Sequence, residues 1–132
     1  MSATGERIRR LNTLAWFGVL AGPVGWALQF LFGMQLGLAR CESPNRRFQF
    51  PVHTTSAVFG GAGFVLGLLG LAAAFSVFRT TRPDPHTQDA AAITEGRLHF
   101  LAAVGMTVNP LTAAICLMVA VGVPLLDLCV QS

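Results

Sequence analysis

Long uninterrupted apolar runs alternate with short polar segments along the chain. The runs cover residues 11–38, 56–78 and 98–126, and none of them contains Arg, Lys, Asp or Glu. Each run is longer than the ~20 residues that an α-helix needs to cross the hydrocarbon core of a bilayer. A helix in a soluble bundle keeps a polar face, which these runs lack. The pattern predicts an all-α integral membrane protein with three transmembrane helices in a single domain, residues 1–132.

The composition favours the same class over a soluble helical protein. Hydrophobic residues make up 53% of the chain and charged residues only 11%, whereas about 25% is usual for soluble domains. The first apolar run is also too long for the ~7–15-residue apolar region of a signal peptide, so we expect it to be retained. The formal net charge of +3 comes from arginines that flank the runs, where membrane topology and lipid headgroups account for them. No nucleic-acid partner is expected.

The basic residues predict how the chain is oriented. All nine are Arg, and they divide unequally between the two sides that a three-span topology creates. Six lie before the first run or between the second and third, and three lie between the first and second: Arg7, Arg9, Arg10, Arg79, Arg82 and Arg97 against Arg40, Arg46 and Arg47. Because basic residues are enriched on the cytoplasmic side, we expect the N-terminus inside and the C-terminus outside, in the cytoplasmic (inner) membrane of a bacterium.

Two cysteines fall on the side predicted to be external. Cys41 follows the first run and Cys129 follows the third, whereas Cys116 lies inside the third run. An oxidising compartment allows Cys41 and Cys129 to form a disulfide. By restricting the unfolded chain, such a bond would stabilise the fold by about 2–4 kcal/mol, as is typical of disulfides. The alternative is two unpaired thiols at the same depth. Cys116 is expected to be a small, inert core residue.

Glycines spaced four residues apart predict close helix packing. Gly18 and Gly22 share a face of the first helix, and Gly63 and Gly67 share a face of the second. Such small residues let helix backbones approach closely in lipid, where association depends on van der Waals fit. Glycines are more numerous on these two helices than one crossing requires. We therefore expect at least one glycine face, with Gly63 and Gly67 as the residues to test, to contact a different membrane protein.

Two prolines predict kinks in the first and third helices. Pro23 and Pro110 each remove a backbone donor near the middle of a run. Asn109 precedes Pro110 and can bond sideways to another helix or repair the interrupted hydrogen bonding of its own helix; we favour local repair. Gln29 and Gln35, in the first run, are expected to face another helix.

The residues that catalysis would need are missing from the runs. They contain no carboxylate, and the chain shows no metal-ligand spacing or phosphate-binding loop. His53 and His99 begin the second and third helices at opposite membrane faces, about 30 Å apart, so one haem iron cannot reach both. We expect no enzymatic activity and no cofactor.

A set of short motifs resembles a family of small three-span bacterial membrane proteins that are encoded beside haem–copper (cytochrome c) terminal oxidases. The resemblance covers nearly the whole chain. It is carried by Trp16, Gly22-Pro23, Trp26, Cys41, His53, Arg97, Phe100, Pro124 and Cys129.

The resemblance implies a non-catalytic accessory subunit or assembly factor of a haem–copper cytochrome oxidase complex, with an oxidase core subunit as partner. The alternative function is a small transporter or channel component acting on its own. That function needs polar residues along one continuous face, and the candidates are Gln29, Gln35, Thr107, Asn109 and Thr112. A copper chaperone using Cys41, Cys129 and His53 would need reduced thiols outside, which an oxidising compartment disfavours.

Overall fold

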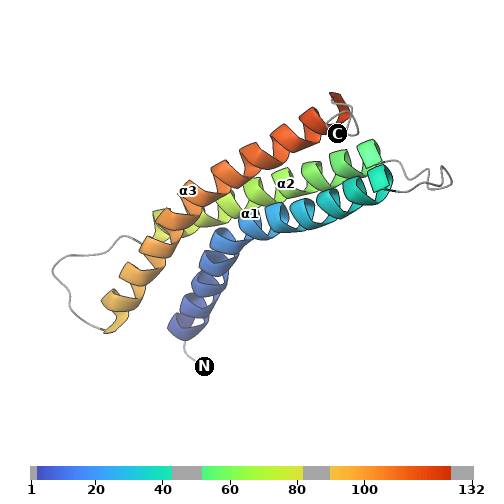
Figure 1. The fold of residues 1–132 in the computed structure, drawn as a ribbon. Helices are drawn as coiled ribbons and strands as arrows, with labels where there is room; N and C mark the ends of the chain where they lie inside the picture. Colours follow the sequence, from blue (N-terminus) through green and yellow to red (C-terminus); the bar gives the residue numbers. More distant parts are fainter. Residues whose placement is uncertain (1–2, 43–51, 82–89, 126–132) are drawn as a thin grey trace.

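The computed structural model describes residues 3–42, 52–81 and 90–125, and three helices account for almost all of them. They are α1 (Ala3–Glu42), α2 (Val52–Thr80) and α3 (Ala90–Leu125). Successive helices run in opposite directions, so α1 and α3 point the same way (Figure 1). Every helix contacts both others. The described part of the chain is therefore an all-α, three-helix bundle.

Each helix is long and apolar enough to cross a membrane. The spanning stretches are Gly5–Gly33, Thr54–Thr80 and Ala92–Val123. A helix satisfies its backbone hydrogen bonds internally, as hydrocarbon requires because it offers no water. The predicted fold class is confirmed, and the chain is a multi-pass membrane protein.

The helices continue past the apolar runs that predicted them. Helix α1 includes Arg7 and Arg10, and α3 begins at Ala90 and includes Glu95 and Arg97. Arg and Glu are good helix formers, so a polar sequence beside a membrane helix does not end it. The connection between α2 and α3 is consequently shorter than the polar pattern suggests.

Small side chains fill the core at the end of the bundle where α1 and α3 begin. Ala15, Val77, Leu98 and Ala102 form a buried cluster at this end. Leu11, Leu14, Phe78 and Leu101 pack around it. All three helices contribute to the cluster, and alanine at its centre keeps them close together.

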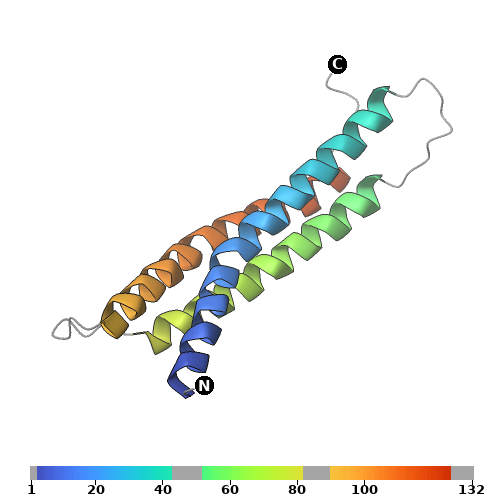
Figure 2. The same cartoon turned by 90° about the horizontal axis from the view of Figure 1, so that it is seen from below.

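Both proline-containing helices change direction. Helix α1 bends in its first half in both views (Figures 1 and 2), and Figure 1 also shows a bend in α3. Pro23 leaves the carbonyl of Val19 without its usual donor, and Pro110 does the same to the carbonyl of Met106. The bends bring the middle of α1 against the middle of α3, where the buried polar site lies.

Candidate functional site

A fully buried amide side chain joins α3 to α1 in the middle of the bundle. Asn109 has 0% exposed surface. Its Oδ1 accepts a hydrogen bond from the backbone N–H of Gly22 at 3.0 Å. Its Nδ2 donates to the carbonyl of Gly18 on α1 and, at 2.7 Å, to the carbonyl of Gly105 on its own helix. One side chain therefore links two turns of backbone on different helices.

The two groups of α1 that Asn109 binds are a matched pair. In a regular α-helix the N–H of residue i donates to the carbonyl of residue i−4, and Gly22 and Gly18 have this spacing. They lie just before Pro23, where the helix loses a donor. The Asn109 amide therefore binds the donor and the acceptor of one helical turn, beside the interruption at Pro23.

The sequence-based preference for local repair at Asn109 accounts for only part of this arrangement. The bond to Gly105 lies within α3, as local repair requires. The bonds to Gly18 and Gly22 cross to α1 and span 91 and 87 positions of sequence. Asn109 is therefore an interhelical link as well as a local one.

Glycines make the space that the amide occupies. A Cβ on Gly22 would lie 2.5 Å from Asn109 Oδ1 and would overlap the hydroxyl of Thr112. A Cβ on Gly70 of α2 would lie 2.7 Å from the same Oδ1. Side chains at either position would expel the amide, so all three helices meet at Asn109.

The same close packing continues along the bundle, and we call the glycines that form it the glycine seam. Its members are Gly18, Gly22, Gly25, Gly60, Gly63, Gly67, Gly70 and Gly105. A Cβ on Gly25 would lie 3.2 Å from the Cα of Gly63, and one on Gly67 would lie 2.9 Å from the Cβ of Ala113. The four glycines singled out for helix packing, Gly18, Gly22, Gly63 and Gly67, all lie in this seam.

The expectation that the glycine face of α2 contacts a different protein is wrong. Gly63 faces Cys116 and Gly25, and Gly67 faces Ala113, so both lie against α1 or α3. The glycine spacing identifies a packing face correctly but carries no information on which helix fills it. A Cβ on Gly33 or Gly61 would meet nothing within 4 Å, so these two glycines lie outside the seam.

Of the two glutamines predicted to face another helix, Gln29 is buried and Gln35 is not. Gln29 is only 4% exposed, and neither atom of its amide has a hydrogen-bond partner among the described residues. Gln35 is exposed. Six positions at about 100° each place the two side chains far apart around the helix, so one helix face cannot bury both.

The polar residues proposed for a transport path do not form one. Thr107 is exposed, and its hydroxyl donates to the carbonyl of Val104. The Thr112 hydroxyl donates to the carbonyls of Val108 and Asn109 on its own helix. Gln29 and Asn109 are buried at different levels, and the contact of Gly25 with Gly63 lies between them along α1.

His53 and His99 lie near opposite ends of α2, and Cys116 lies in the core between the helices. Cys116 is a free cysteine with 0% exposed surface, packed against Gly63 as a small core residue. The ring of His99 stacks on Phe78 with centroids 4.2 Å apart. His53 lies in the first turn of α2, about 37 Å along that helix from Phe78 at ~1.5 Å per residue.

Two further sequence-based expectations concern metals and the disulfide. Within the described ranges no group of three or more His, Cys, Asp or Glu could hold a metal ion. The side chain of Cys41 and the whole of Cys129 lie outside the described residues. The disulfide between them stays a prediction.

The chemistry of the site is that of a structural link. The Asn109 amide is neutral, its hydrogen-bond partners among the described residues are neutral backbone groups, and the neighbouring Thr112 hydroxyl bonds within its own helix. Such a network holds helices in register. No known protein family, curated protein or solved structure matches the chain.

Proposed function

We propose that the chain is a non-catalytic accessory subunit or assembly factor of a haem–copper cytochrome oxidase complex. The observation that carries the proposal is the structural role of the buried Asn109 amide. Its hydrogen bonds to Gly22 and Gly18 hold α3 against α1. The resemblance to proteins encoded beside such oxidases names the partner. Gly22 and Pro23, which help to carry that resemblance, lie at the Asn109 link, so the shared motif coincides with the part of α1 that shapes the bundle.

The outer surface of α1 is suited to contact with a larger membrane protein. Trp26 and Phe30 are 39% and 54% exposed, and their rings stack with centroids 5.9 Å apart. Stacking holds each ring in one orientation, so a partner meets a preformed surface. Aromatic side chains supply much of the binding energy at protein interfaces. We propose that Trp26 and Phe30, the aromatic pair, contact the partner.

The alternative function, a transporter or channel component, is less well supported. The axis of the bundle is closed by contacts such as that of Gly60 with Ala120, where a Cβ would lie 2.6 Å from the Ala120 Cβ. A permeating molecule would have to separate the helices along the glycine seam. It would also have to break the bonds of Asn109.

We further propose a bacterial inner-membrane location with the N-terminus inside. The support is the arginine distribution, six on one side against three on the other. A topology reporter fused after Ser132 should be active only in the periplasm. Activity of that fusion in the cytoplasm would contradict the proposed orientation, and with it the argument that Cys41 and Cys129 face an oxidising compartment.

Co-purification tests the proposed partner. The tagged chain, extracted from native membranes in mild detergent, should bring down oxidase core subunits that mass spectrometry identifies. Replacing both members of the aromatic pair with Ala should reduce the recovered oxidase severalfold. Leu111→Ala is the matched control, because Leu111 is 67% exposed on α3 and lies outside the proposed surface.

Two outcomes would contradict this account. If the wild-type chain brings down no oxidase subunit, the proposed function fails. If wild type and the double variant recover equal amounts, the oxidase is the partner but the aromatic pair is not the contact. Circular dichroism of each purified variant shows whether the helices are intact.

A further inference from the structure

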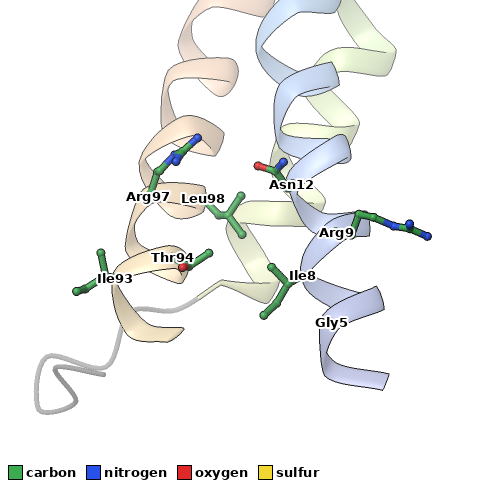
Figure 3. A pocket seen from close by; sticks show the side chains of 8 residues that line it. All are labelled: Gly5, Ile8, Arg9, Asn12, Ile93, Thr94, Arg97 and Leu98. Atoms are coloured by element: carbon green, nitrogen blue, oxygen red, sulfur yellow. The ribbon is translucent and has the colours of Figure 1, made fainter. Parts of the chain in front are cut away.

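A cleft opens between α1 and α3 at the end of the bundle where both helices begin (Figure 3). Its volume is about 320 Å³. Part of its wall is apolar, with Ile8 on α1 and the nearly buried Leu98 on α3. The rest is polar, with Arg9 and Asn12 on α1 and Arg97 on α3. A ligand in this cleft would meet both hydrocarbon and positive charge.

The polar groups of the cleft are available to a ligand. Arg9 and Arg97 are both exposed, and neither forms an ion pair with a residue in the described ranges, including Glu6 and Glu95 on the same helices. Figure 3 shows Asn12 directed toward the space between the helices, Arg97 extending along the ribbon of α3, and Arg9 pointing away from the cleft. Among the described residues, the cleft is therefore lined by two arginines without an ion-pair partner, and this charge favours an anion.

The position of the cleft indicates which anion. It lies where the membrane-spanning stretches of α1 and α3 begin, at Gly5 and Ala92, which is the level of the lipid headgroups. Guanidinium groups match phosphate oxygens in geometry as well as charge. An apolar wall beside them suits the start of an acyl chain. A phospholipid combines these two features in one molecule.

We propose that this cleft binds one anionic phospholipid. Arg97 holds the phosphate from α3, Asn12 donates to it from α1, and Arg9 swings over it from the rim. The first part of an acyl chain lies against Ile8 and Leu98. The volume is at the lower end of the ~300–1,000 Å³ typical of ligand sites, which fits a single headgroup. Because the lipid touches both helices, it ties together the ends of α1 and α3.

Native mass spectrometry of delipidated protein in detergent, titrated with phosphatidylglycerol, tests the proposal. Wild type should bind one lipid tightly, and Arg97→Gln should weaken that binding about tenfold, as expected for loss of a charged hydrogen bond. Arg9→Gln should weaken it by a smaller factor, and Arg97→Lys should restore part of the affinity. Arg79→Gln is the control, because Arg79 lies at the same end of the bundle but stacks 5.5 Å from the Phe75 ring centroid on α2.

The other outcomes overturn the proposal. Equal affinity of wild type, Arg97→Gln and Arg9→Gln would show that the cleft is not the site. An equal loss in Arg79→Gln would show attraction by overall charge alone. Phosphatidylcholine binding as tightly as phosphatidylglycerol would remove the requirement for an anionic lipid. Inorganic phosphate that displaces the lipid at equal concentration would identify a phosphate-ion site instead.

Discussion

Asn109→Ala should lower the free energy of unfolding by about 2 kcal/mol. The substitution removes two hydrogen bonds between α3 and α1, and interhelical bonds in membranes average about 0.6 kcal/mol with a maximum near 1.7. It also leaves a void at a position with 0% exposure, which adds a cavity term. Unfolding by SDS titration from detergent micelles measures the difference.

Thr107→Ala is the matched control for this substitution. Thr107 is on the same helix, is exposed, and bonds only the carbonyl of Val104. It should change the free energy of unfolding by less than about 0.5 kcal/mol, as is usual for surface positions. Equal effects of the two substitutions would mean that Asn109 contributes only to its own helix.

Gly60→Ala should destabilise the bundle by about 1–3 kcal/mol, the usual cost of overpacking a tight interior. The added Cβ would lie 2.6 Å from the Cβ of Ala120, 3.0 Å from its Cα and 3.1 Å from the carbonyl oxygen of Cys116. None of these atoms belongs to a flexible side chain, so α2 and α3 must separate. Thermal unfolding in the same detergent detects the loss.

Gly61→Ala provides a control at the neighbouring position. A Cβ on Gly61 would meet nothing within 4 Å, and Ala is the better helix former by about 1 kcal/mol in water. This variant should be as stable as wild type or slightly more so. A similar loss in both variants would show that α2 is sensitive to any added methyl group, and that the glycine seam is not the reason.

The sequence predicts the class and the number of helices because hydrocarbon imposes a simple requirement. A run of more than ~20 apolar residues without charge has few alternatives to a membrane helix. The ends are predicted less well, since the third apolar run begins at Leu98 whereas α3 begins at Ala90. At the membrane surface both helix and coil are allowed, and charged residues such as Glu95 and Arg97 do not decide between them.

The site itself is harder to predict, because it depends on the register between helices. The spacing of Gly18 and Gly22 identifies a packing face, and Pro23 and Pro110 locate two interruptions in helix hydrogen bonding. Nothing in the pattern says that the two interruptions lie side by side. A buried Asn in one helix and a Gly-Pro pair near the middle of another is the signal that could have suggested the link.

The wrong expectation for the α2 glycines has a related cause. The expectation compares the number of glycines with the number that one helix–helix contact requires. Helix α2, however, packs against two helices, α1 and α3. Gly63 contacts both neighbours, Gly25 on α1 and Cys116 on α3. A face that looks too large for one partner is fully used by two.

Solid-state NMR in lipid tests the central claim, the link from Asn109 to α1, most directly. Protein with ¹⁵N in its Asn side chains and ¹³C in its Gly carbonyls is prepared on an Asn12→Gln, Asn45→Gln background, so that Asn109 carries the one labelled Asn amide. The account predicts cross peaks from Asn109 Nδ2 to the carbonyl carbons of both Gly18 and Gly105. A cross peak to Gly105 alone would contradict it, because Asn109 would then serve only its own helix.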